Sequence, residues 1–480
     1  MMSVAVSQGT FVAGSPHAPV SFLHLHFDVL VLVLEHLTRC EHLQLMCASR
    51  SLQTLLVPHL LRLPFTLRRT ERLRAFNAFM LRDAPLRILH LHRLTIGLSY
   101  FWSTRLSEGF ATVLRAARNL EELSLLDAGL LEDAGDVPHA IAAMPALRRL
   151  KVCFPQDAAL AMLRAVEAPL TRVDVSFKKA KRFAGDPVAL LAKQHASLAE
   201  LCVSLPRFAD APDESEASGG VRFEALTELI IKCHQAFRVA PVVYHYPNVR
   251  RLTVLMCAGH CWHGGGPSTI VRDEAEIEAM HEANGRERAH VWTRLQHVRV
   301  DAASLYAMNL ACAAPSVDVV DVGESDVPRI GPVLKALKPA KLVLRIKQRC
   351  FWAHGLGFVQ DVLPSSVQSV AVAIDDAPAP NVEDKNAMEQ LALCSQTMTH
   401  LIVVWDTISS HRLWNGEANL PALAQRYAET NPALEYLLIA FKRPEISWGW
   451  RMGSRRAYKP TTLYKLSDEE IEQIMADSLV

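Results

Sequence analysis

Two cysteines and two histidines lie close together near the middle of the chain and could bind a metal ion. They are Cys257, His260, Cys261 and His263, in a segment rich in glycine. Thiolate and imidazole groups are ligands that zinc prefers, but this spacing fits no zinc finger or zinc knuckle. Cys257 also follows a predicted strand, where a buried thiol that serves only packing is expected. We therefore predict no metal ion, and the sequence indicates no other cofactor.

The motifs that carry common catalytic chemistry are missing from the sequence. It contains no Gly-x-Ser-x-Gly, no His-Glu-x-x-His, no phosphate-binding glycine loop and no dinucleotide-binding fingerprint. The stretch HEANG at 281–285 begins like a zinc-protease motif but lacks the second histidine. We therefore expect no catalytic residues, and we do not expect an enzyme.

Two basic segments could contact nucleic acid. KKAKR at 178–182 looks like a nuclear import signal, and residues 442–459 mix basic residues with aromatic ones. The first lies between a predicted strand and a predicted helix, where a solvated basic turn is common, and the second is expected to pack on the last repeat. The whole chain has 51 Lys and Arg against 50 Asp and Glu, and it has no apolar run long enough to span a bilayer. We predict neither nucleic acid nor a membrane as a partner.

A repeated pattern, apolar-x-x-apolar-x-apolar, predicts the elements that position the remaining polar residues. Between residues 120 and 249 its copies start 23–28 residues apart, and leucine-rich repeats have periods of roughly 20–29 residues. Helix-like stretches such as 109–119 and 186–196 lie between the copies. The copies start at Leu86, Leu120, Leu147, Leu170, Leu198, Leu226, Val249, Leu295, Val317, Lys341, Val367, Met398 and Leu434.

These copies predict an α/β fold, an irregular leucine-rich-repeat solenoid with parallel strands on the concave face and helices or loops outside. A doubly wound α/β domain also alternates strands and helices, but it needs only about six strands, fewer than the copies found here. The solenoid should place one apolar residue of each copy in a single buried column, which contains Leu123, Leu150, Val173, Leu201, Leu229 and Leu252.

Side chains alternate along a strand, so the residues between the core positions point to the opposite face. We predict that the residues exposed on this face, where a partner protein can reach them, are Arg149, Lys151, Arg172, Asp174, Glu228, Lys232, Arg251, Arg299 and Asp301. In the last copies the same face is apolar, with Ala371, Ala373, Ile402, Val404, Leu438 and Ala440. We expect residues 441–466 to cover it, with Trp448 and Trp450 as anchors and ISWGW (446–450) as an added strand. The alternative is a loose tail that leaves the apolar patch free for a partner. A terminal helix with a capping box from Ser467 to Glu470 is expected to cap the open end.

The stretch before the repeats, residues 25–52, resembles an F-box. Leu25-His26-Phe27-Asp28 corresponds to the opening Leu-Pro-x-Glu of that family, and Glu41-His42-Leu43 corresponds to its acidic-Leu-Leu turn. His26 stands where the family has Pro, and Ser49 and Leu52 stand where it has Cys and an aromatic residue. The resemblance implies that the side chains which contact an adaptor protein are Leu25, Val29, Leu30, Val33, Leu34, Leu37 and Leu43.

An F-box followed by leucine-rich repeats resembles the F-box/leucine-rich-repeat proteins, which are abundant in fungal genomes. The resemblance implies a substrate-recognition subunit of a cullin–RING (SCF-type) ubiquitin ligase. The F-box would dock on the ubiquitin-ligase adaptor, and through it on the cullin scaffold, while the repeats hold an unknown protein substrate. The alternative is a leucine-rich-repeat scaffold without ligase association, in which the F-box-like segment only caps the solenoid.

The cysteines and the segment boundaries complete the expectations. Ten scattered cysteines and the absence of an Asn-x-Ser/Thr sequon favour a reducing compartment, so we expect a cytoplasmic or nuclear location, or both. Within the solenoid we expect a mobile acidic loop at 209–220 and an insertion at 257–290. The predicted segments are a disordered stretch at 1–20, an F-box-like helical domain at 21–62, a helical linker at 63–85, the solenoid at 86–440 and a capping tail at 441–480.

Overall fold

A computed structural model describes most of the chain. The described residues are 29, 32–34, 36–98, 103–177, 187–204, 220–256, 273–287, 292–347, 350, 359, 362–375, 398–406, 420–441, 446–452 and 463–479. The predictions for residues 1–20, for KKAKR at 178–182, for the loop at 209–219 and for the Cys/His segment at 257–263 lie outside these residues.

One sheet extends from residue 65 to residue 465, and its sixteen strands follow one another in sequence order. Neighbouring strands are parallel from β1 to β14, and β15 and β16 are antiparallel to their neighbours. This confirms the predicted α/β fold with a long parallel sheet. The strands are β1 (Phe65–Leu67), β2 (Arg93–Ile96), β3 (Glu122–Leu125), β4 (Arg149–Cys153), β5 (Arg172–Ser176), β6 (Glu200–Ser204), β7 (Glu228–Cys233), β8 (Arg251–Met256), β9 (His297–Asp301), β10 (Ser316–Val322), β11 (Lys341–Lys347), β12 (Ser369–Asp375), β13 (His400–Asp406), β14 (Tyr436–Phe441), β15 (Ile446–Met452) and β16 (Leu463–Lys465).

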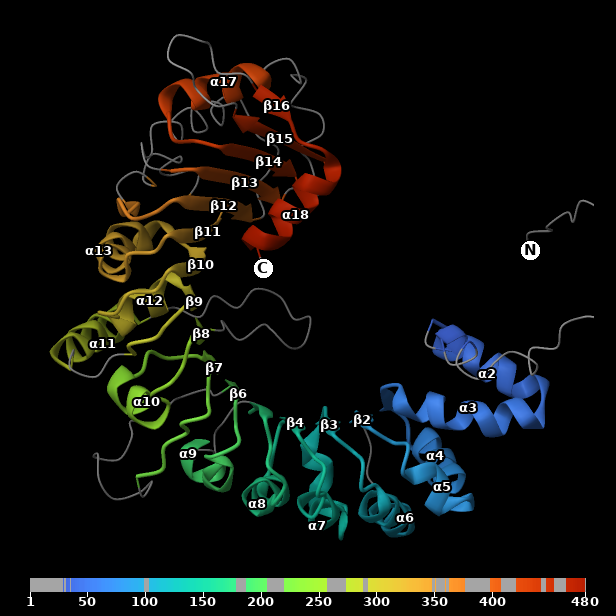
Figure 1. Cartoon of the computed structure of the whole chain (residues 1–480). Coiled ribbons are helices and arrows are strands. Elements are labelled where there is room, and N and C mark those ends of the chain that lie inside the picture. Colours follow the sequence, from blue (N-terminus) through green and yellow to red (C-terminus); the bar gives the residue numbers. More distant parts are fainter. Residues whose placement is uncertain are drawn as a thin grey trace, which may run out of the picture.

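Helices connect most of these strands and lie on one side of the sheet. In Figure 1 the strands line the inner side of an arc, here called the concave face, and most helices form its outer side. The α-helices are α2 (Arg39–Ala48), α3 (Arg50–Arg62), α4 (Thr70–Arg82), α5 (Ala84–Ile88), α6 (Thr104–Ala116), α7 (Val137–Ala142), α8 (Asp157–Ala165), α9 (Pro187–Leu190), α10 (Val239–His245), α11 (Glu274–Arg286), α12 (Ala302–Met308), α13 (Val327–Leu337), α17 (Leu420–Thr430) and α18 (Asp468–Leu479).

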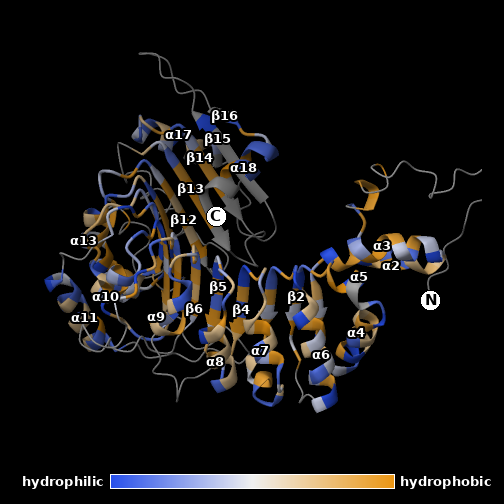
Figure 2. Ribbon diagram, turned by 60° about the horizontal axis from the view of Figure 1, so that its bottom comes forward, coloured by the Kyte–Doolittle hydropathy of each residue, from blue (hydrophilic) through white to orange (hydrophobic). Residues whose placement is uncertain are grey.

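The predicted column of apolar side chains is confirmed. Its six members face one another in register across consecutive strands, from Leu123 on β3 to Leu252 on β8. Each is at most 2% exposed, and each belongs to the large core between the strands and the outer helices. Figure 2 shows hydrophobic residues along the strands that line this core. Neighbouring parallel strands lie about 4.8 Å apart, so every column residue packs against the one before it and the one after it.

The first predicted copy of the repeat is wrong. The copy LRILHL is predicted to start at Leu86. That residue lies in helix α5, which spans 84–88 and has Pro85 in its first turn. Proline is well suited to the start of a helix because its fixed backbone angle matches the helix and its missing N–H needs no partner there. The strand comes five residues later in LHRLTI, which starts at Leu91 and forms β2. The predicted helical linker at 63–85 is also wrong, because it contains strand β1 as well as helix α4.

Two later copies are strands as predicted, but their register is shifted. Val317 lies opposite Val298, the fourth position of its copy, so the copy starts at Ala314 and not at Val317. Leu342 lies opposite Val317 in turn, so the next copy is shifted as well. The stretch VDVVDV at 317–322 satisfies the pattern in more than one register, since four of its six residues are valine and neither aspartate falls on an apolar position in either register. Pairing with neighbouring strands decides between the registers.

The end of the chain adds strands and then returns across the concave face. ISWGW lies in β15, which pairs antiparallel with β14 and so confirms the predicted added strand. The predicted capping box is present, with the Ser467 backbone N–H donating to Glu470 Oε2 at 2.9 Å. Helix α18 lies on the inner side of the arc and not at the open end of the sheet (Figure 1). The side chains described against the apolar patch are Leu466 and Ile471, whereas the side chains of Trp448 and Trp450 lie outside the described part of the structure.

Truncation of one column residue tests the architecture. We expect Leu201→Ala to lower the free energy of unfolding by about 2–5 kcal/mol, because it leaves a cavity between two packed neighbours. Glu200→Ala on the same strand removes only an exposed ion pair with Arg172 and should cost at most about 1 kcal/mol. Urea unfolding followed by circular dichroism measures both. Equal destabilisation by the two substitutions would contradict the buried column.

Candidate functional site

The N-terminal helical unit, residues 29–62, has a small core of its own. Leu34, Leu52 and Leu56 are buried together, and four further apolar residues pack around them. A capping box begins α2, with the Thr38 backbone N–H donating to Glu41 Oε2 at 2.6 Å. These contacts hold α2 against α3 and leave the outer side of α2 in solvent.

The exposed apolar side chains of the molecule are concentrated at this end. Of the large hydrophobic residues that are exposed in the described chain, all but Tyr244 lie between residues 29 and 89. They are Val29, Leu32, Val33, Leu43, Leu81, Leu86 and Leu89. An exposed apolar cluster on a folded protein commonly marks a surface that binds another protein.

The residues predicted to contact an adaptor fall into three groups. Val29, Val33 and Leu43 are exposed, with Leu43 at 46%. Leu34 is only 2% exposed and serves the core of the helical unit, and Leu37 packs beside it. Leu25 and Leu30 lie outside the described residues. The surface available to a partner is therefore built by the first group.

The helical unit is attached to the first strand of the sheet. The Arg39 guanidinium lies 4.0 Å from the centre of the Phe65 ring on β1 and donates from Nη1 to the backbone oxygen of Pro64 at 3.3 Å. Burial lowers the pKa of Arg39, and the nearby Arg72 lowers it further. Met46 packs against both the core of the helical unit and the main core. The unit and the sheet are thus joined by packing as well as by the chain.

Charged side chains form a row along the concave face, one from each strand from β2 to β8 in register. Glu122 on β3 lies between Arg93 on β2, at 3.9 Å, and Arg149 on β4, at 3.1 Å. Arg172 on β5 pairs with Glu200 on β6 at 2.9 Å. The side chains of these five residues are about a third to a half exposed. Such pairs add at most about 1 kcal/mol each, so their donors and acceptors can exchange partners at little cost.

A second row runs beside the first and contains a more buried carboxylate. Lys151 on β4 lies 3.2 Å from Asp174 on β5. Further along, Asp318 on β10 lies between Arg299 on β9 and Arg345 on β11, with each Nε 3.4 Å from a carboxylate oxygen. Two guanidinium groups surround one carboxylate, so this part of the concave face is positively charged.

Eight of the nine residues predicted for the substrate face lie on strands at concave positions, partly or fully exposed. They are Arg149, Lys151, Arg172, Asp174, Glu228, Lys232, Arg251 and Arg299. Asp301 was predicted wrongly, because it is 1% exposed and caps helix α12. It accepts hydrogen bonds from the backbone of Met256 at 2.6 Å and from the backbone and hydroxyl of Ser304 at 3.0 and 2.6 Å. An aspartate that ends a strand directly before a helix is a typical N-cap.

The sequence prediction missed two concave residues, Asp318 and Arg345. The misplaced copy at 317 hid Asp318, because a shift of three residues assigns it to the opposite face of the strand. The copy at 341 is shifted by two residues, which leaves Arg345 on the concave face, so the register does not account for its omission. With the copy started at Ala314, Asp318 occupies the position of Arg299 in the preceding copy. The opposite charges of Arg299 and Asp318, which pair across β9 and β10, are a sequence signal that favours this register.

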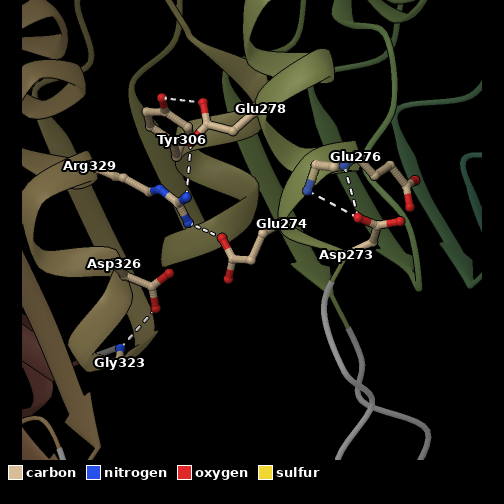
Figure 3. Close-up of polar contacts among 9 residues, drawn as sticks. Asp273, Glu274, Glu276, Glu278, Tyr306, Gly323, Asp326 and Arg329 are labelled. Atoms are coloured by element: carbon tan, nitrogen blue, oxygen red, sulfur yellow. Dashed lines mark hydrogen bonds and ion pairs between the residues drawn. The ribbon is translucent and has the colours of Figure 1, made fainter.

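The insertion contributes helix α11, which lies on the outer side of the arc in Figure 1, and Figure 3 shows the polar contacts around it. Arg329 on α13 forms ion pairs with Glu274 and Glu278, the latter at 2.9 Å. The Tyr306 hydroxyl donates to Glu278 at 2.9 Å. Asp273 caps the helix by accepting from the backbone at residues 275 and 276. These carboxylates hold helices together, and no group of His, Cys, Asp and Glu in the described residues is arranged to hold a metal ion.

Cys202 occupies the second row between Asp174 and Ile230. Burial raises the pKa of its thiol to about 12, and the negative charge of Asp174 adds to the effect. The reactive form of cysteine is the thiolate, which is then a tiny fraction of the total at pH 8. Cys202 therefore contributes a small packed side chain to the concave face and does not act as a nucleophile.

Thiol alkylation tests this description. At pH 8 iodoacetamide should modify the exposed Cys40 and Cys47 at least about a hundred times faster than Cys202, whose thiol is almost fully protonated. Peptide mass spectrometry over a time course measures each rate, and labelling in urea serves as the control in which the rates converge. Modification of native Cys202 as fast as that of Cys40 would contradict a partly buried, protonated thiol.

Comparisons with known proteins assign no family to the chain, and its function has to be inferred from its exposed surfaces. The chain matches no protein-family model, and no curated protein matches it significantly. Among the described helices, none combines the length and the apolar character needed to cross a membrane. What the geometry offers is an exposed apolar surface on the N-terminal helical unit and a charged concave face on the sheet that follows.

Proposed function

We propose that this chain is the substrate-recognition subunit of a cullin–RING ubiquitin ligase. In this proposal the N-terminal helical unit docks on the ligase adaptor, and the concave face binds a target protein in the cytoplasm or nucleus. The chain contributes binding and carries out no chemistry itself. The observation that carries the proposal is the concentration of exposed apolar side chains at residues 29–43, within the stretch that resembles an F-box.

Burial of these side chains supplies the free energy for docking. A fully buried Leu or Val side chain contributes about 1.5–3 kcal/mol relative to an exposed one. Association costs several kcal/mol of lost translational and rotational freedom, so three or four such side chains are needed before binding becomes favourable. Val29, Leu32, Val33 and Leu43 meet that number.

The concave face suits recognition of a folded or extended protein by charge. Its two rows present arginine, lysine, glutamate and aspartate at strand spacing, and most of them are partly exposed. Because exposed ion pairs contribute little to stability, a target that brings its own charges can replace them. Complementary charge favours the correct partner and speeds its association.

The alternative function is that of a protein-interaction scaffold without a ligase. The contacts of Arg39 with Phe65 and Pro64 favour it, because they make the helical unit a cap for the first strand. A cap of this kind accounts for the buried leucines of α3. It gives no role to Val33 and Leu43, which face solvent.

Co-purification with the SCF-type adaptor separates the two functions. We expect the wild-type chain to retain the adaptor, and Val33→Asp or Leu43→Asp to reduce the recovered adaptor at least about tenfold, which corresponds to about 1.4 kcal/mol. Leu86→Asp is the matched control, because Leu86 is 74% exposed on α5 outside the helical unit. Circular dichroism confirms that each variant is folded. Absence of binding by the wild type, or equal loss in the control, would favour the scaffold.

A further inference from the structure

A small apolar cluster lies on the concave side of the sheet, apart from the main core. Six sheet residues on four neighbouring strands contribute to it, and all are at most 7% exposed. They are covered by Ile471 on α18 and by Leu466, which precedes the N-cap of that helix. Ile474 and Tyr436 pack at the side. The sheet residues are Val343, Ala371, Ala373, Ile402, Val404 and Leu438.

This patch continues the second row of the concave face. Arg299, Asp318 and Val343 occupy one register position on β9, β10 and β11. From β11 onward the row is apolar, and Ala371, Ile402 and Leu438 follow on β12, β13 and β14. The concave face therefore has an open, charged half and an apolar half that α18 covers.

The helix that covers the patch has a distinct chemical pattern. Its first turn holds three carboxylates, at positions 468, 469 and 470, and its apolar contacts come from Ile471 and Ile474, three residues apart. Glu470 accepts from Arg451 Nη2 on β15 at 2.7 Å, and both side chains are about half exposed. Backbone and side-chain hydrogen bonds from Ser467 lower the pKa of Glu470, so it is charged at neutral pH.

The sheet does not need α18 to hold its strands together. The main core lies on the other side of the same strands and includes Leu344, Val372, Val403 and Ile439, which alternate with the patch residues. In the described chain the helix side supplies only a few aliphatic side chains to the patch and one exposed ion pair. The strands would therefore keep their main core if α18 left the patch.

We propose that the apolar half of the concave face is a docking surface for an amphipathic helix of a partner protein, and that α18 occupies it when no partner is bound. The partner helix has the chemistry of α18, with an acidic first turn followed by branched aliphatic residues three positions apart. Arg451 receives its acidic turn, as it now receives Glu470, and Arg345, opposite Ala373 at the border of the patch, adds positive charge. The proposal deepens the assignment of the concave face to target binding and rests on it.

A labelled peptide tests this competition in the full-length protein. The probe is a fluorescein-labelled peptide of residues 466–480, LSDEEIEQIMADSLV, and binding is followed by fluorescence anisotropy. The substitution Ile471→Asp in the chain should expel its own helix, because it places a charge among buried aliphatic groups. Gln473→Asp is the matched control, since it adds the same charge at an exposed position of the same helix.

We expect the peptide to bind the Ile471→Asp chain at least about tenfold more tightly than the wild type or the control. The same peptide with Ile471→Asp and Ile474→Asp should not bind, and about 0.5 M salt should weaken the binding of the original peptide because exposed charges are screened. Equal affinity for wild type and variant would overturn the proposal. The proposal would also be overturned if the peptide did not bind an Ile471→Asp chain that melts at the wild-type temperature.

Hydrogen exchange on the wild type decides the matter if the variant does not fold. Amides of α18 should then exchange at least about tenfold faster than those of β13, because the helix opens without the sheet. Exchange of both at one rate would overturn the proposal. The adaptor test at Leu43 concerns the other end of the molecule. Loss of adaptor binding would therefore leave the peptide result unchanged. Failure of the peptide test would likewise leave adaptor binding unchanged.

Discussion

The in-register stacking of apolar side chains between neighbouring strands is the interaction on which the rest of the molecule depends. A single strand and its helix cannot bury their apolar sides alone, and each repeat gains its core only from the repeats beside it. The column through Leu150 and Leu201 therefore holds the strands in one register. That register in turn places the charged side chains of the opposite face in rows, so the surface chemistry follows from the core.

Much of the solenoid could be predicted from the sequence because its core positions are strongly apolar and recur at a regular interval. The predictions failed where the local pattern was ambiguous. LRILHL fits the strand pattern as well as LHRLTI does, and only the helix-starting role of Pro85 distinguishes them. In VDVVDV the β-branched residues fit several registers, and the pairing of Val317 with Val298 resolves them. Asp301 and Asp318 both follow apolar strand residues, yet one caps a helix and the other faces two arginines.

The change of the concave face from charged to apolar had a visible sequence signal, and that signal predicted a cover from residues 441–466. Leu466, the last residue of that segment, lies on the patch, and Ile471 on α18 lies on it as well. The sequence prediction missed Ile471, because it assigned the terminal helix to the open end of the sheet. The predicted anchors Trp448 and Trp450, chosen because large side chains bury the most area, have side chains outside the described part of the structure.

The two outermost strands affect the tendency of the protein to aggregate with other copies in the cell. A sheet of parallel strands is open at both ends, and an unpaired strand edge is a template for aggregation with a second copy. Both outermost strands of the described sheet, β1 and β16, are only three residues long, whereas the interior strands reach seven. At the C-terminal end of the sheet β16 pairs antiparallel with β15, so a strand added there would have to pair with this short strand. Strands this short offer a second copy few unpaired backbone groups, so strand addition is discouraged at either border.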